Sequence, residues 1–543
     1  MDATGSAVSR ALWLLLLLPC LAVADEQPSP DEARWAVRGE TTARVEYYDM
    51  RGDSGLGRYT EDGLQAYQDI NLGLSRGDAG GSFWDIDVSG VLSGSDYRTS
   101  EPGARLEYLR LHHENASARV PYRLDLGDQR ARFSRLSLDQ NLRGARLELQ
   151  PQAGRADYSL VWLSGAYRRH YYGRGSLAPE GNYHGASWLI ADPAFGHWSF
   201  NAVHYDAPAS AAEQRQHLVA SFAGNWEFDV LHQQVEAEAE WAWLDGAVHS
   251  GASDARSQSL RDRGWHTSVA GVDGLTPLPL DYTLSYERYG ADFAPVGTRV
   301  RGDSRALKTT AGLTLSERSR LQGRYHRYLD NAATGNPTRI DEHGMQVAAP
   351  FRVGGLDTRH TLDLAHRERV NRAGTIDQLT RSANWRLNLP LAETQDTRLN
   401  LYWLDLDDRA GGRFARTERR VSVAHRSRFR WGELDVTAAP GVAYRTSEGF
   451  LEQHSLHPTL SLAVAGPLHE LGIALGYRTL ERPGLRAPDL DEYHLSMDWR
   501  YQVERHQLGI EYEHLLAQPD GGENLDLWRA GLFWRYKFFG GAP

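Results

Sequence analysis

The 543-residue chain lacks several features that define common protein classes. Its one cysteine is Cys20, so the rest of the chain has no disulfide, no thiolate metal site and no C-x-x-C-H haem attachment of its own. After residue 24, no apolar run reaches the roughly 18–20 residues that a membrane-spanning helix requires. No G-x-S-x-G or comparable catalytic motif is present. We therefore expect a protein that is not an enzyme and binds no cofactor by itself.

Lysine is also nearly absent. Of the 60 basic residues only Lys308 and Lys537 are lysine, and the formal net charge is −11. This charge argues against a nucleic-acid partner, because such proteins usually carry a basic patch or an excess of positive charge.

The first 24 residues form a secretory signal. Arg10 supplies the positive charge, residues 11–19 form a short apolar core, and residues 22–24 read Ala-Val-Ala, a small-residue cleavage site. Lipoprotein processing at Cys20 is the competing interpretation, and Pro19 immediately before it disfavours that. We expect four segments, namely a signal peptide (1–24), a short periplasmic N-terminal segment (25–34), a transmembrane β-barrel (35–538) and a C-terminal tail (539–543).

The stretch 525–538, LDLWRAGLFWRYKF, shows the pattern that recurs along the chain. In a strand, successive side chains point to opposite faces. One face here is apolar and ends in aromatic residues, whereas the other is mostly cationic. A strand with lipid on one side and a wet lumen on the other requires this arrangement.

About 26 segments repeat this alternation, and a count of 22–26 strands is compatible with the sequence. Their 10–14 residues suit a tilted bilayer crossing. Long connections such as 168–183, 245–263 and 330–343 alternate with connections of only a few residues. The sequence therefore predicts an all-β fold, a single large antiparallel transmembrane β-barrel with short periplasmic turns and longer extracellular loops. We expect it in the outer membrane of a Gram-negative bacterium, in contact with lipid.

One segment carries an unusually regular inner row. The apolar residues at odd positions from 235 to 243 predict a lipid-facing side. The opposite side would carry an acidic row into the lumen, formed by Glu236, Glu238 and Glu240.

The end of the last segment resembles the C-terminal signature by which outer-membrane barrels are recognised for insertion. The residues that carry this resemblance are Gly531, Trp534, Tyr536 and Phe538. It implies an interaction with the barrel-assembly machinery.

Segment 128–141 combines arginines with its own apolar residues. Arg130, Arg132 and Arg135 lie within it, and Arg143 follows. One interpretation is a loop folded into the lumen as an anion-attracting constriction, since arginines lining a pore lower the barrier for anions. The other interpretation is an ordinary extracellular hairpin extension. The sequence favours neither.

Strand number sets the width of the lumen. With 26 strands about 4.8 Å apart and tilted near 40°, the backbone diameter is roughly 50 Å. An unobstructed hole of that size would abolish the outer membrane as a barrier. We therefore expect another molecule to fill the lumen.

The segment that begins at Glu46, EYYDMRGDSGLGRYTEDG, with the paired alternating strands that follow, resembles the start of the MtrB/PioB family of electron-conduit barrels. That resemblance implies a sheath around a periplasmic multihaem c-type cytochrome, with haem supplied only by the partner and electron transfer across the outer membrane. The first alternative is a solute or polysaccharide-export porin with an arginine-lined constriction. The second is an outer-membrane enzyme, for which no motif is present.

Overall fold

The computed structural model describes residues 35–52, 62–78, 80–94, 103–167, 181–207, 213–230, 233–250, 257–273, 279–333, 335–450, 452–483 and 489–538. The signal peptide, the segment 25–34 and the tail 539–543 lie outside the described residues. Among the described residues, no helix is long and apolar enough to cross a membrane.

The described chain is built from strands. Their bounds are β1 (Ala36–Arg51), β2 (Gly63–Gly77), β3 (Ser82–Ser93), β4 (Gly103–Asn115), β5 (Tyr122–Ser134), β6 (Leu138–Leu149), β7 (Gln152–Ala153), β8 (Ala156–Tyr167), β9 (Asn182–Asp192), β10 (Gly196–Asp206), β11 (Glu213–Val230), β12 (Gln233–Ser250), β13 (Ser257–Asp273), β14 (Leu280–Tyr289), β15 (Ser304–Ser316), β16 (Ser319–Asp330), β17 (Thr338–Val353), β18 (Leu356–Asn371), β19 (Asp377–Ala392), β20 (Gln395–Asp408), β21 (Arg416–Trp431), β22 (Leu434–Gly449), β23 (Gln453–Ala465), β24 (His469–Glu481), β25 (Leu490–Val503), β26 (His506–Pro519) and β27 (Leu525–Phe538).

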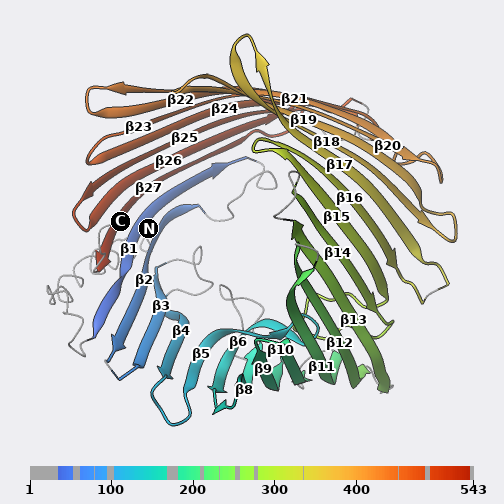
Figure 1. Cartoon of the computed structure of the whole chain (residues 1–543). Coiled ribbons are helices and arrows are strands. Elements are labelled where there is room, and N and C mark those ends of the chain that lie inside the picture. The colour runs from blue at the N-terminus through green and yellow to red at the C-terminus, as the bar shows by residue number, and fades with distance from the viewer. Residues whose placement is uncertain are drawn as a thin grey trace.

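These strands form one closed antiparallel barrel (Figure 1). Each long strand pairs with the next along the chain, and β6 pairs with β8 because the two-residue β7 only extends the turn between them. β1 pairs with β27 from Gly39↔Phe538 to Arg51↔Asp526, which closes the ring. The expected single barrel is confirmed, with 26 full-length strands. The barrel has a turn end, where β1 begins and β27 ends, and an opposite loop end.

The two faces of the wall differ as the alternation predicts. Exposed large apolar side chains project outward along the strands, among them Trp162, Trp188, Phe200, Trp241, Trp265, Trp403, Leu460, Leu475, Ile510 and Leu532. The alternate residues face the lumen and are mostly polar. An outward apolar belt and a polar interior are the solvation pattern of a transmembrane barrel.

Several predicted loops are shorter than expected because the strands extend further. Residues 245–263 were expected to be a loop, but β12 continues to Ser250 and β13 begins at Ser257; likewise β17 begins at Thr338. These strand ends lack clear alternation. Where both faces of a hairpin contact water, neither face has to be apolar. The alternation of apolar and polar residues that predicts a strand is then absent.

Candidate functional site: the barrel lumen

The hairpin of β5 and β6 leaves the wall and bends into the lumen. Pairing between β4 and β5 ends at Arg110↔Gly127, so residues 103–109 of β4, toward the loop end, are not paired with β5. Gly127 has φ +96°, and a Cβ there would lie 2.1 Å from the carbonyl oxygen of Leu109. Only glycine tolerates both the conformation and the close approach. The bend therefore begins at Gly127.

At the bend, where backbone pairing between β4 and β5 has ended, side-chain hydrogen bonds connect the two strands. The backbone N–H of Leu109 donates to the buried carboxylate of Asp128 over 2.9 Å. Arg143 donates to the same carboxylate through Nε and Nη2, each over 2.6 Å, and to the carbonyl oxygen of Glu107 over 3.3 Å. A bidentate arginine–carboxylate pair of this kind fixes geometry as well as charge. The pair of Asp128 and Arg143 thus joins the departing hairpin to the wall.

The end of the hairpin lies along the inner wall (Figure 1). Its apolar side chains pack against the strands of the wall. Ala131, Leu138 and Leu142 belong to a cluster contributed by the hairpin and by β8, β9 and β10, completed by Leu163, Tyr183, Val203 and Tyr205. At the tip, Leu136 packs in a second cluster with residues of β11 to β14 and Phe293. These clusters lie between the hairpin and the wall, and not at the barrel axis.

A buried carboxylate holds the hairpin tip. Glu240 is only 3% exposed and accepts hydrogen bonds from Ser134 Oγ over 2.6 Å and from the backbone N–H of Leu136 over 3.1 Å. Ser134 is also within hydrogen-bonding distance of the hydroxyls of Ser137 and Ser221. Because a buried carboxyl group needs hydrogen-bond partners, the tip and Glu240 stabilise each other.

The connection 290–303 lies beside the hairpin and contacts both the hairpin and the wall strand β11. The N–H of Asp139 donates to the carbonyl oxygen of Gly297 over 2.8 Å. The N–H of Val296 donates to His217 Nε2, and Arg215 donates to the carbonyl oxygen of Ala294. We call the two inward segments, 128–143 and 290–303, the inner shelf. The sequence analysis did not single out this second segment, and the signal that could have indicated it is its apolar residues, which include Phe293, Val296 and Val300.

The shelf presents arginines to the lumen. Arg130, Arg132 and Arg135 alternate with, or flank, the residues that pack on the wall, and all three are exposed. Arg130 pairs with Asp139 and Arg135 pairs with Glu287, yet their side chains remain 61% and 43% exposed. Arg143 was expected in the same group, but it lies in the half-buried pair with Asp128. Whether these arginines select anions stays a prediction.

The predicted acidic row on β12 faces inward, but its members differ. Glu236 accepts a hydrogen bond from Asn225, and Glu238 lies 3.7 Å from His266 Nε2. Glu240 is covered by the hairpin tip, which the sequence pattern did not reveal. Glu236 and Glu238 therefore face the open lumen, whereas Glu240 holds the hairpin tip.

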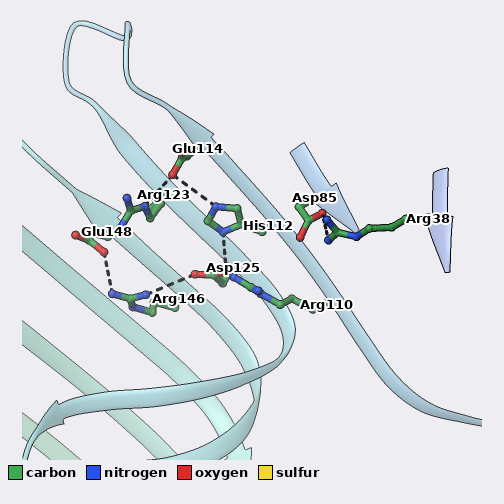
Figure 2. A network of polar contacts seen from close by, with 9 residues as sticks. All are labelled: Arg38, Asp85, Arg110, His112, Glu114, Arg123, Asp125, Arg146 and Glu148. Atoms are coloured by element: carbon green, nitrogen blue, oxygen red, sulfur yellow. Dashed lines mark hydrogen bonds and ion pairs between the residues drawn. The ribbon is translucent and has the colours of Figure 1, made fainter. Parts of the chain in front are cut away.

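Elsewhere the inner wall carries ion pairs that link neighbouring strands (Figure 2). Asp125 lies 2.8 Å from His112 Nδ1, 2.9 Å from an Arg110 nitrogen and 3.6 Å from an Arg146 nitrogen. Arg146 also pairs with Glu148, and Arg123 with Glu114. Acids and bases in this network are close to balanced.

A second network lies at the seam that closes the barrel. Arg44 pairs with Glu46 over 3.0 Å and with Glu511 over 2.7 Å, while Arg529 lies 3.7 Å from Glu46. Tyr48 donates to Glu46 over 2.6 Å. These contacts join the first strand to the last two. Among the described residues, no group of histidine, cysteine and acidic side chains is arranged to hold a metal ion.

The residues that resemble an insertion signature lie on β27. Trp534 and Tyr536 point outward with stacked rings, and His506 stacks on Trp534. Gly531 faces the lumen beside Glu46, and the backbone of Phe538 pairs with Gly39. Recognition of these residues by the assembly machinery stays a prediction.

No family model matches the chain, and no curated protein matches it. Solved barrels share its architecture at low similarity. The outer-membrane transporter YddB from Escherichia coli is 9% identical, with 92% of this chain and 81% of that chain covered and a TM-score of 0.44. The P pilus tip assembly intermediate PapC–PapD–PapK–PapG from E. coli is 10% identical, with 95% and 64% covered and a TM-score of 0.48. A BenF-like porin from Pseudomonas fluorescens is 11% identical, with 67% and 99% covered and a TM-score of 0.34. The barrel assignment rests on the strand pairing itself, and the resemblance to the MtrB/PioB family stays a prediction.

Proposed function

We propose that the chain is an outer-membrane conduit that encloses a second molecule in its lumen. The expected partner is a folded periplasmic protein such as a multihaem c-type cytochrome, which would carry electrons across the membrane. The observation that carries this proposal is the position of the inner shelf. Both of its segments lie against the wall, so neither crosses the lumen.

Width supports the proposal. A layer packed on a sheet adds about 10 Å, whereas 26 strands enclose a lumen roughly 50 Å across. The shelf therefore narrows the passage from one side without closing it. A second molecule that fills the remaining space would preserve the permeability barrier.

The chemistry of the wall also supports an enclosed protein. The networks around Asp125 and Glu46 present charged but largely compensated side chains to the lumen. Such a surface suits polar contacts with a hydrated protein partner, in which charge complementarity fixes the orientation. Any haem would belong to the partner, because this chain has no C-x-x-C-H motif.

A second candidate function is passage of an anionic solute or polysaccharide. The specific observation in its favour is the exposed position of Arg130, Arg132 and Arg135 on the lumen side of the shelf. Arginines in such a position lower the barrier for anions.

One preparation tests both candidates. The barrel is purified from its native membranes, scanned for haem absorbance, and reconstituted in planar bilayers with and without whatever copurifies. A lumen partner predicts a nearly sealed complex, and large, erratic conductance or a collapsed barrel after the partner is removed. Steady, small, anion-selective conductance from the isolated chain would contradict the enclosed partner and support the second candidate.

A further inference from the structure

The inner wall opposite the β5–β6 hairpin contains a pocket that the proposed function does not use. It lies at the turn end, has a volume of about 710 Å³ and is lined by side chains from β15 to β20. Its charged lining consists of five arginines and one carboxylate, namely Arg318, Arg320, Arg359, Arg386, Arg398 and Glu317. The amides of Asn388 and Asn400 lie among the last three arginines.

Strand register arranges these groups in two adjacent rows. In one row, Arg386 on β19 lies opposite Thr361 on β18 and Asn400 on β20 in the strand register. In the next row, Asn388 lies opposite Arg359 on β18 and Arg398 on β20. Each guanidinium group therefore has an uncharged amide or hydroxyl group as its neighbour in both directions across the three strands.

The rows face the lumen. The residues next to them along β20, Leu401 and Trp403, are exposed on the outer apolar belt. Because side chains alternate between the two faces, Arg398 and Asn400 point inward. Register then places their partners on β18 and β19 on the same face.

Positive charge in the pocket is only partly compensated. Arg320 pairs with Asp281 over 2.6 Å, and Arg398 lies 3.3 Å from Asp396 and 62% exposed. Within the part of the chain that the structure describes, neither Arg359 nor Arg386 forms an ion pair within 4.0 Å, and the carboxylate of Asp363, two residues from Thr361 on the same face, interacts with Arg386 only at longer range. The surplus favours an anionic ligand.

The amides have unused hydrogen-bonding capacity. The side-chain oxygens of Asn388 and Asn400 are buried and have no hydrogen-bond partner among the described residues. Buried amide groups normally have one. Small side-chain rotations would bring these amides to the pocket surface, where they can exchange hydrogen bonds with hydroxyl groups.

The arginines are spread over several strands. Arg320 on β16 pairs with Asp281, so the arginines open to a ligand are Arg359, Arg386 and Arg398 on three adjacent strands. Arg359 and Arg398 are two strand spacings apart, which is about 10 Å. A ligand that pairs separately with each of the three must carry repeated negative charges.

We propose that this pocket binds an acidic oligosaccharide, whose carboxylates pair with Arg359, Arg386 and Arg398 and whose hydroxyls meet Asn388 and Asn400. An acidic polypeptide supplies the carboxylates but not the regularly spaced hydroxyls, so the alternation of arginine and amide favours the saccharide. This inference goes beyond an enclosed partner, because it concerns a ligand of the wall and is testable on the isolated chain.

The test uses the detergent-purified full-length chain, with its folded form verified by heat-modifiable gel mobility. Calorimetric titration compares oligogalacturonate, neutral maltodextrin and poly-L-glutamate. We expect oligogalacturonate to bind more tightly than poly-L-glutamate and maltodextrin not to bind. Arg359→Gln with Arg386→Gln should weaken oligogalacturonate binding about tenfold or more, since two charge-assisted hydrogen-bonding groups are lost.

The matched control is Arg381→Gln with Arg419→Gln, which removes the same charge. Arg381 shares β19 with Arg386 but has the opposite strand parity and faces outward, as does Arg419 on β21. The control variant should bind like the unmodified chain. Equal effects of the two double variants, or no binding of oligogalacturonate, would overturn the site. Tighter binding of poly-L-glutamate would overturn the saccharide and assign the pocket to an acidic polypeptide. Any lumen partner is removed before the titration, because it would cover the pocket, and heat-modifiable mobility then verifies that the barrel is still closed. The presence or absence of a partner is read from the purification, whereas binding at the pocket is read from the titration, so the two inferences fail separately.

Discussion

Ser134 Oγ donates to the Glu240 carboxylate over 2.6 Å across 106 residues of sequence. Ser134 ends β5 and Glu240 lies in the middle of β12, so the contact joins the hairpin tip to a wall strand that is distant around the barrel. The inward position of the arginines depends on this contact and on the apolar packing beside it.

The first prediction concerns this anchor. Glu240→Ala removes the acceptor for Ser134 Oγ and for the Leu136 N–H, and leaves both donors buried. Each buried unsatisfied group costs about 1–3 kcal/mol. We expect the tip to detach while the barrel stays closed. The measurement is limited trypsin cleavage after Arg135, together with heat-modifiable mobility of the intact barrel.

Glu236→Ala is the matched control for the anchor. Glu236 lies on the same face of β12 four residues away, is exposed, and accepts a hydrogen bond from Asn225 of the wall. Its replacement should leave the cleavage rate unchanged. If both variants were cleaved at the rate of the unmodified chain, Glu240 would not hold the tip.

The sequence was sufficient to predict the barrel, because every strand that crosses a membrane must alternate apolar residues toward lipid with polar residues toward the lumen. The end of the chain shows this well, since the predicted last strand, 525–538, coincides with β27. The alternation of Val235 and Glu236 likewise placed each residue on its face. Strand ends beyond the membrane were missed because water on both faces removes the pattern.

The lumen was harder to predict because its contacts are distant in sequence. Nothing near Glu240 distinguishes it from Glu238, and its burial comes from a hairpin about 100 residues earlier. The arginine cluster of 128–141 was visible, but its placement depends on the bend at Gly127. A glycine in a strand is common, and only the structure shows that a Cβ there would contact Leu109.

The second prediction concerns the two faces of β12. Ala239→Arg puts a guanidinium on the outer face in the middle of the strand. Such a substitution costs about 2–4 kcal/mol at the bilayer midplane. Glu238→Arg, one residue away, reaches the lumen and should be tolerated. The measurement is the free energy of unfolding in lipid vesicles. Equal losses would mean that the faces of β12 are assigned incorrectly.

The third prediction separates Arg143 from the exposed arginines of the shelf. Arg143→Gln leaves the buried Asp128 carboxylate without its bidentate partner, and leaving a buried group without its hydrogen bonds costs about 1–3 kcal/mol. Arg132→Gln removes an exposed charge and should change stability by about 0.5 kcal/mol or less. Unfolding in lipid vesicles measures both. Comparable stability of the two variants would contradict a structural role for the pair of Asp128 and Arg143.

The last prediction concerns insertion, and the barrel contains its own control. Trp534 and Tyr536 on β27 stack with His506 on the outer face. Trp499 and Tyr501 on β25 stack with His469 in the same way. Loss of either pair removes the same side chains from equivalent surroundings.

If the terminal strand is an assembly signal, loss of the aromatic pair will prevent insertion only on β27. Loss of the equivalent lipid-facing pair on β25 will not prevent it. We expect Trp534→Ala with Tyr536→Ala to abolish insertion, and Trp499→Ala with Tyr501→Ala to lower stability while the chain still reaches the membrane. Gly531→Ala is tested separately, because its Cβ would lie 3.3 Å from Glu46 Cγ at the seam, a close contact that adds a steric effect of its own. Membrane fractionation and gel mobility report insertion. Equal membrane levels of the two double variants would remove the assembly role from β27 and leave its aromatic residues as interfacial anchors.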